Sequence, residues 1–129
     1  MVPFSKETAM KKIVLIEDEQ HIAEALQFLF TQQGWKVAMH NDGATALDLI
    51  RSEAPDLVVL DIMILNKSGL DVLREMRESK DIADIPVLML TAKGQANNRM
   101  AAELAGATQF MTKPFSNAEL IETVRALIP

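Results

Sequence analysis

Short apolar runs recur along the chain, separated by longer segments in which apolar residues are three or four positions apart. Three runs are continuous, at residues 13–16, 57–60 and 87–90. A fourth, Trp35 to Met39, alternates between apolar and polar residues, and a weaker fifth lies at Phe110 and Met111. Continuous runs are typical of strands buried on both faces, as in parallel sheets covered by helices. The runs therefore predict five strands.

The segments between the runs have the spacing of amphipathic helices. Ile22, Leu26 and Leu29 share one face of a first helix. Later helices are expected to bury four further sets: Leu47 and Ile50; Leu70, Leu73 and Met76; Ala101, Leu104 and Ala105; Leu120, Val124, Leu127 and Ile128. A strand and a helix repeated five times predict an α/β fold, a single doubly wound (βα)5 domain with right-handed crossovers.

Local signals mark several helix ends. Ser116 followed by Glu119 fits a capping box, and Ser68 followed by Asp71 is a close variant. Glu19 is expected to cap the first helix, where negative charge suits the helix dipole. Two glycines are expected to end helices in the left-handed conformation: Gly34 and Gly106.

The chain has the length of one domain. We expect an N-terminal extension over residues 1–10 and one domain over residues 11–129. No apolar run approaches the length of a membrane span, and the N-terminus lacks the apolar segment of a secretory signal. We therefore expect a cytoplasmic protein that does not contact the membrane.

Composition removes several function classes. The hydrophobic content of 49% is enough for a core. The formal net charge is −5 and no basic stripe is present, so we expect no nucleic-acid binding by this domain. The absence of cysteine excludes disulfides and thiolate zinc sites.

Polar residues follow the predicted strands at their carboxyl ends, where open α/β sheets place their sites. Glu17-Asp18-Glu19 follows the first strand, Asp61 the third, Thr91 the fourth and Lys113-Pro114 the fifth. Carboxylates gathered at one edge raise one another's pKa and need an offsetting charge. Lys113 supplies part of it, and a hard cation such as Mg²⁺, which prefers oxygen ligands, suits the rest. Carboxylate, hydroxyl and ammonium together favour phosphoryl transfer.

Four segments, in order and at matching strand ends, resemble the receiver domain of response regulators. They are Ile13 to Glu19, Asp56 to Asp61 with Gly69 following, Leu88 to Ala92, and Met111 to Phe115. Each motif alone is weak, but the set of four is specific. The resemblance extends from about residue 10 to residue 128. It implies a flavodoxin-like parallel sheet of strand order 2-1-3-4-5.

The resemblance implies a phosphorelay function. Asp61 would accept a phosphoryl group from a sensor histidine kinase or a phosphotransfer protein, with Mg²⁺ or Mn²⁺ as the cofactor. Asp18, Asp61 and the backbone carbonyl of Met63 would bind the metal, and Glu17 would act through a metal-bound water. Thr91 and Lys113 would bind the phosphoryl oxygens. Such a protein is a signalling receiver that assists its own phosphorylation and dephosphorylation, not an ordinary enzyme.

The resemblance also implies a switch and an output. Thr91 and Phe110 would form the switch, and the bond from Lys113 to Pro114 would be cis. The face over residues 95–128 would change its binding to an unknown downstream target. The protein would be a monomer or a weak, phosphorylation-dependent dimer.

The sequence departs from the family pattern at several positions. Glu17 stands where Asp is commoner, Leu65 where Pro is frequent and Phe110 where Tyr is frequent. Leu65 predicts a looser loop after Asp61. Thr108 and Gln109 stand where a transcription-factor subfamily has acidic residues, which argues against the ion-paired dimer of that subfamily.

Other interpretations remain open. The chain could be a pseudo-receiver that only binds partners, or the receiver part of a larger DNA-binding regulator. A flavodoxin, a haloacid-type phosphatase and a Ca²⁺ loop fit poorly, because Glu17-Asp18-Glu19, Met63 and Leu65 do not supply their motifs. By their side chains, Met63 and most other methionines are expected in the core. His21 and His40 are expected at the surface, without a metal-binding role.

Overall fold

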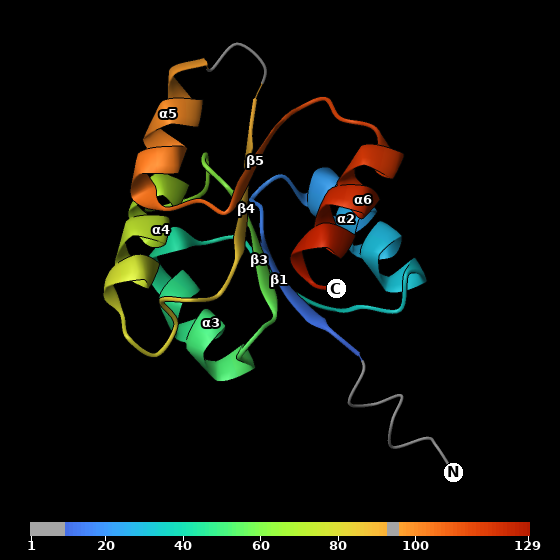
Figure 1. Ribbon diagram of the computed structural model, residues 1–129, viewed down its shortest axis with the longest axis horizontal. Helices are drawn as coiled ribbons and strands as arrows, with labels where there is room; N and C mark the ends of the chain where they lie inside the picture. Colours follow the sequence, from blue (N-terminus) through green and yellow to red (C-terminus); the bar gives the residue numbers. More distant parts are fainter. Residues whose placement is uncertain (1–9, 93–95) are drawn as a thin grey trace.

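The computed structural model describes residues 10–92 and 96–129, in which strands and helices alternate (Figure 1). The strands are β1 (Lys12–Ile16), β2 (Lys36–His40), β3 (Leu57–Asp61), β4 (Val87–Thr91) and β5 (Gln109–Thr112). The helices are α2 (Gln20–Gln32), α3 (Ala46–Glu53), α4 (Gly69–Glu78), α5 (Ala96–Ala105) and α6 (Asn117–Leu127), with a 3-10 turn η1 (Gly43–Thr45) before α3. Every predicted strand is confirmed, with bounds within one residue of those expected. The N-terminal extension expected over residues 1–10 lies, except for Met10, outside the described residues.

Within the described residues the strands form one parallel sheet of order β2-β1-β3-β4-β5, as the resemblance implied. Ile16 is paired with Leu60, and Asp61 with Leu90. Because the strands are parallel and nearly level, their last residues lie along one edge of the sheet. We call this the carboxyl edge.

Helices cover both faces of the sheet (Figure 1). Successive side chains of a strand point to opposite faces, so Val14 and Ile16 of β1 pack in one cluster and Ile13 and Leu15 in another. The first cluster includes residues of α3, α4 and α5, and the second residues of α2 and α6. All five residues of β3 and of β4 are buried, which confirms the interpretation of their continuous apolar runs.

The buried face of helix α5 matches the prediction only in part, at Ala105. Ala102 and Ala105 are in the core, but Leu104 is 83% exposed. The prediction of Leu104 as a core residue was wrong because the buried face of α5 consists of small residues, so hydrophobicity did not fix its phase. Phe30 of α2 is fully buried although the predicted set for that helix did not include it.

The methionines are also not mainly core residues. Met76 and Met89 are buried, but Met39, Met63 and Met100 are exposed. The prediction that the side chain of Met63 is buried was therefore wrong. Met63 lies in the loop between β3 and α4, where the chain runs along the surface.

The helix-end signals are largely confirmed. Ser116 and Glu119 form a capping box at α6. The hydroxyl of Ser68 caps α4 by accepting from the amide of Leu70, which is a simple cap without the box. Glu19 occupies the N-cap position of α2, but its side chain makes no capping hydrogen bond. Gly34 and Gly106 have φ of 90° and 104°, as predicted for left-handed helix ends.

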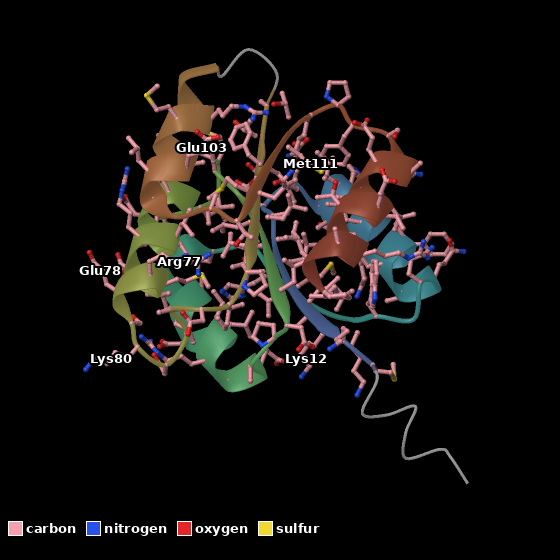
Figure 2. The ribbon with its side chains drawn as sticks, viewed as in Figure 1. Lys12, Arg77, Glu78, Lys80, Glu103 and Met111 are labelled. Atoms are coloured by element: carbon pink, nitrogen blue, oxygen red, sulfur yellow. The ribbon has the colours of Figure 1, made fainter. Side chains whose placement is uncertain are left out.

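Figure 2 shows Arg77 on α4. Away from the carboxyl edge, at the end of the sheet where β4 and β5 begin, this side chain joins α4 to two other segments. Its guanidinium donates to the carbonyl oxygens of Gly106 at 2.9 Å, Ala83 at 2.9 Å and Ile85 at 2.7 Å. These bonds link α4 to the loop before β4 and to the end of α5. In the described parts of the chain, no helix is both long and apolar enough to cross a membrane.

Candidate functional site

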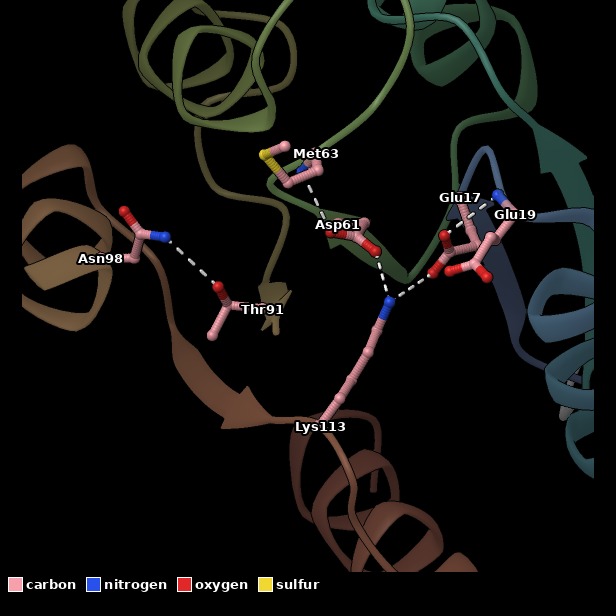
Figure 3. A network of polar contacts seen from close by, with 7 residues as sticks. All are labelled: Glu17, Glu19, Asp61, Met63, Thr91, Asn98 and Lys113. Atoms are coloured by element: carbon pink, nitrogen blue, oxygen red, sulfur yellow. Dashed lines mark hydrogen bonds and ion pairs between the residues drawn. The ribbon is translucent and has the colours of Figure 1, made fainter. Parts of the chain in front are cut away.

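Three charged side chains from distant parts of the chain meet at the carboxyl edge (Figure 3). Glu17 directly follows β1, Asp61 is the last residue of β3, and Lys113 directly follows β5. The backbone amide of Lys113 donates to the carbonyl oxygen of Thr91 at 2.7 Å, which continues the pairing of β5 with β4 beyond the strand. Strand pairing therefore fixes the backbone positions of Glu17, Asp61 and Lys113 independently of their side-chain contacts.

Lys113 bridges the two carboxylates. Its Nζ donates to Oδ2 of Asp61 at 2.5 Å and to Oε1 of Glu17 at 2.9 Å. Glu17 is 3% exposed and Asp61 is 4% exposed, so both acids are almost removed from water. A buried carboxylate is stable only when it is paired. The ammonium of Lys113 therefore holds together two acids that would otherwise repel.

The second oxygen of each carboxylate accepts a backbone hydrogen bond. The amide of Met63 donates to Oδ1 of Asp61 at 3.0 Å, and the amide of Glu19 donates to Oε2 of Glu17 at 3.2 Å (Figure 3). In each case the donor lies two residues after the acid. These local turns fix the orientation of both carboxylates relative to Lys113.

The pKa values follow from this arrangement. Burial is the largest cause that raises the pKa of Glu17, the neighbouring carboxyl group of Asp61 also raises it, and Lys113 lowers it; together they bring the pKa to about 7. Burial acts to lower the pKa of Lys113, but hydrogen bonds and charges from Asp61 and Glu17 outweigh it, so the pKa of Lys113 is raised. Lys113 is thus a firmly protonated cation beside two acids.

The expected cluster of three carboxylates is not assembled. Glu17 and Asp61 share Lys113, whereas Asp18 is exposed. In residues 10–92 and 96–129, no group of three or more acidic, histidine or cysteine side chains is placed to hold a metal ion. Adjacent side chains at a strand end point in different directions, so Glu17 and Asp18 do not both face Lys113.

The donor set nevertheless fits a hard divalent cation. Mg²⁺ uses oxygen ligands, commonly one or two carboxylates with several waters, and does not require an all-protein cage. Glu17 and Asp61 supply such oxygens. A hollow open to solvent is lined by Glu17, Asp18 and His40, but not by Asp61. Burial is the main cause of the raised pKa of Glu17, and the neighbouring carboxyl group of Asp61 adds to it. A cation beside the two acids would favour their ionised forms.

The profile of one protein family, described as the response regulator receiver domain, matches residues 13–125. This chain belongs to the response regulator receiver domain family. Receiver domains are signalling modules of two-component systems rather than ordinary enzymes.

Solved structures of receiver domains have the same fold. The receiver domain of the Francisella response regulator 1452 is 30% identical, with a TM-score of 0.84, 92% of this chain covered and 96% of that chain. The BeF3-activated N-terminal receiver domain of RstA from Klebsiella pneumoniae is 27% identical, with a TM-score of 0.85 and coverage of 91% and 97%. The receiver domain of sensor histidine kinase PA1611 from Pseudomonas aeruginosa, solved with magnesium in its active-site cleft, shares the fold at 24% identity, a TM-score of 0.85 and coverage of 92% and 98%.

The other residues expected at the site lie on β4 and β5 or directly after β5. Thr91 is 1% exposed, and its hydroxyl accepts from Nδ2 of Asn98 at 3.4 Å. Phe110 is buried against the core on the side of α5, with the guanidinium carbon of Arg99 5.1 Å from its ring centre. The bond from Lys113 to Pro114 is cis, as the resemblance implied. Lys93, two residues after Thr91 in the sequence, lies outside the described residues.

Asn98 and Arg99 were not predicted near the site by any motif. Both lie in the first turns of α5, the helix that begins at the carboxyl edge after β4. In doubly wound folds the helix starts beside the site line its walls, so this position in the topology was the signal that could have identified them. His40, expected at the surface, accepts from or donates to the hydroxyl of Thr45 at 2.7 Å.

Proposed function

We propose that this receiver domain accepts a phosphoryl group on Asp61 from a sensor histidine kinase or a phosphotransfer protein. The observation that carries the proposal is the contact between the Nζ of Lys113 and Oδ2 of a nearly buried Asp61 at the carboxyl edge. A nucleophilic carboxylate beside a fixed cation is the arrangement that phosphoryl transfer needs, because negative charge develops on the transferred oxygens.

Each residue of the site has a role in this proposal. A carboxylate oxygen of Asp61 forms the new bond to phosphorus as the phosphorus–nitrogen bond of the donor histidine breaks, and that electron pair stays on the imidazole. Lys113 then pairs with a phosphoryl oxygen instead of the Asp61 carboxylate. The hydroxyl of Thr91, at the adjacent strand end, donates to another phosphoryl oxygen.

Mg²⁺, or Mn²⁺, is the proposed cofactor, and when bound it neutralises charge on the phosphoryl oxygens. The proposal assigns its binding to Asp61, Asp18 and the backbone carbonyl of Met63, with Glu17 acting through a metal-bound water. The oxygen-only donor set supports the assignment. The magnesium ion in the cleft of the Pseudomonas aeruginosa receiver domain supports it as a property of a related fold.

The proposed output is a change in partner binding. Thr91 and Phe110 form the proposed switch, and the responding face lies within residues 95–128, of which residues 96–128 are described. The partner that binds this face is the proposed downstream target. In this proposal the protein acts in the cytoplasm, as a monomer or a weak, phosphorylation-dependent dimer.

The test is the intact mass of the protein after incubation with a small-molecule phosphodonor and Mg²⁺. We expect the wild type to gain the mass of one phosphoryl group, and the Asp61→Asn variant to gain none. Asp56→Asn is the matched control, because Asp56 precedes the same strand at the opposite edge, where its carboxylate accepts from the amide of Lys12. This control should be phosphorylated like the wild type.

A wild type without added mass has two explanations, which further measurements distinguish. If the wild type gains no mass, binding of a stable phosphoryl mimic with Mg²⁺ distinguishes rapid hydrolysis from an inactive site. Absence of both phosphorylation and mimic binding would reject the proposal in favour of a pseudo-receiver. Phosphorylation of Asp61→Asn to the wild-type level would show that the acceptor is another residue.

A further inference from the structure

The loop after Asp61, residues 62–68, is bound to the loop after β2. Asp42 and Leu65 form an isolated parallel bridge, and the amide of Gly43 donates to the carbonyl oxygen of Leu65 at 2.8 Å. Only some side chains of this loop pack against the core. Ile64 does so, but Met63 is 68% exposed and Leu65 is 50% exposed. Polar contacts between the two loops therefore matter for the position of the Met63 backbone.

One carboxylate joins the two loops directly. Oδ1 of Asp42 accepts from the amide of Ala44 at 2.8 Å, which caps η1, and Oδ2 accepts from Nδ2 of Asn66 at 2.8 Å. An ionised carboxylate only accepts, so the orientation of the Asn66 amide is unambiguous. Asn66 has a φ of 66°, a conformation that Asn tolerates better than most residues. We call this contact the Asp42–Asn66 clasp.

The loops also approach too closely for a side chain at Gly43. A Cβ added there would lie 2.5 Å from the carbonyl oxygen of Lys67 and 2.7 Å from its Cβ. Beyond this contact, the amide of Gly69 donates to the carbonyl oxygen of Ile62 at 2.8 Å. The loop is thus restrained near its start, at its middle and at its end.

We propose that Asp42 and Asn66 are positioning residues of the receiver site. The clasp fixes the backbone between Ile62 and Asn66, and with it the amide of Met63 that orients Oδ1 of Asp61 at 3.0 Å. It also fixes the carbonyl of Met63, to which the proposed function assigns a metal ligand. The inference rests on that function. It also explains how a chain with Leu65 in place of proline restrains this loop, which the sequence had predicted to be looser.

Two variants distinguish the effect of losing the Asp42–Asn66 contact from effects of charge and of backbone strain. Asn66→Gly removes the clasp while keeping a residue that accepts a positive φ without strain, and it changes no charge. The double variant Asp42→Asn with Asn66→Asp reverses donor and acceptor. Its new amide can still accept from the amide of Ala44 through oxygen, and the net charge of the pair is unchanged.

The first measurement is the Mg²⁺ dissociation constant by titration calorimetry. We expect Asn66→Gly to weaken Mg²⁺ binding by about tenfold, the usual scale for losing a group that orients a metal ligand. The double variant should return to near the wild-type value. Phosphorylation of Asn66→Gly should be slow at low Mg²⁺ and approach the wild-type rate at saturating Mg²⁺, because the clasp acts on the site through position alone.

The second measurement does not depend on the metal. In metal-free protein, amide hydrogen exchange at Met63 should be faster in Asn66→Gly than in the wild type, while exchange at Val59 within β3 stays unchanged. Asp56→Asn again serves as the control for a lost contact at the opposite edge, and it should leave both Mg²⁺ affinity and Met63 exchange unaffected.

The outcomes are distinguishable. Wild-type Mg²⁺ affinity and wild-type Met63 exchange in Asn66→Gly would overturn the clasp, as would a double variant as impaired as Asn66→Gly. If the wild type itself neither binds Mg²⁺ nor is phosphorylated, the proposed function fails. The exchange at Met63 then decides separately whether the clasp positions this loop.

Discussion

Glu17 shows how the fold acts on a single residue. Its carboxylate is nearly buried and close to that of Asp61, so its pKa rises from 4.5 to about 7 in the folded protein. The folded protein then holds this proton more tightly than the unfolded chain does between these two pH values. The contribution of Glu17 to the free energy of unfolding is therefore largest below about pH 4.5, and it is lost as the pH rises towards about 7.

We expect the Glu17→Gln variant to lack this loss. In metal-free buffer with a chelator, the contribution of Glu17 to the free energy of unfolding should fall by roughly 2–3 kcal/mol across this window in the wild type, since one pKa unit corresponds to about 1.4 kcal/mol. Urea unfolding at several pH values measures the fall. Glu24→Gln, an exposed change on α2 with the same loss of charge, should keep the wild-type pH dependence. A full fall in Glu17→Gln would assign it to another group.

At the same residue scale, the sequence predicted which residue types gather at the carboxyl edge but not how they pair. Strand ends follow from hydrophobic periodicity and from the parallel topology, so Glu17, Asp61, Thr91 and Lys113 could be placed together. The choice of Glu17 rather than Asp18 as the partner of Lys113 depends on the direction in which each side chain leaves the strand end. Periodicity locates strand ends only to within a residue, and that error reverses the direction.

At the scale of elements, α4 can begin where it does only because Gly69 has no side chain. A Cβ at Gly69 would lie 2.2 Å from the carbonyl oxygen of Asp61 and 2.9 Å from Cα of Ile62. These are backbone atoms at the end of β3, which cannot move without moving the site. A change in the packing of α4 against β3 would therefore also change the position of Asp61.

We expect Gly69→Ala to lower the free energy of unfolding by about 3 kcal/mol, the upper part of the usual range for overpacking. Gly34→Ala is the matched control: nothing lies within 4 Å of its added Cβ, and its cost arises from the φ of 90°. That strain is worth about 1–2 kcal/mol. Urea unfolding of both variants measures the difference. A smaller loss in Gly69→Ala than in Gly34→Ala would show that the start of α4 adapts more easily than its contacts indicate.

Element positions were predictable where large apolar residues set the phase, as in β3 and β4. They were not predictable in α5, whose buried residues include Ala102 and Ala105 while Leu104 faces solvent. Alanine gains little from burial, so the neighbouring elements, not the helix's own pattern, decide which face packs. The loop contacts of Asp42 and Asn66 were equally hidden, because they join two loops that no periodicity describes.

At the scale of the whole molecule, the site exists only when the sheet is complete. Lys113 is 96 residues from Glu17 and 52 residues from Asp61 in the sequence, and the strands β1, β3, β4 and β5 must all pair to bring them together. The opposite edge is held by different contacts, such as those of Arg77. The two edges are therefore separate environments connected by rigid strands.

Trp35 tests this separation, because it precedes β2 at the edge away from the site. Its ring lies 5.9 Å from that of Phe30, and the residue after it, Lys36, pairs with Lys12 at the start of β1. Five strand residues separate that point from Glu17, a distance of roughly 17 Å at about 3.3 Å per residue. We expect Mg²⁺ to leave the fluorescence of Trp35 almost unchanged. The positive control is Met63→Trp combined with Trp35→Phe, which puts the indole on the exposed side chain next to the site and should respond to Mg²⁺. Strong quenching of the wild type would mean that ion binding reorganises the sheet from edge to edge, whereas a response confined to the control would show that the ion's effect stays at the carboxyl edge.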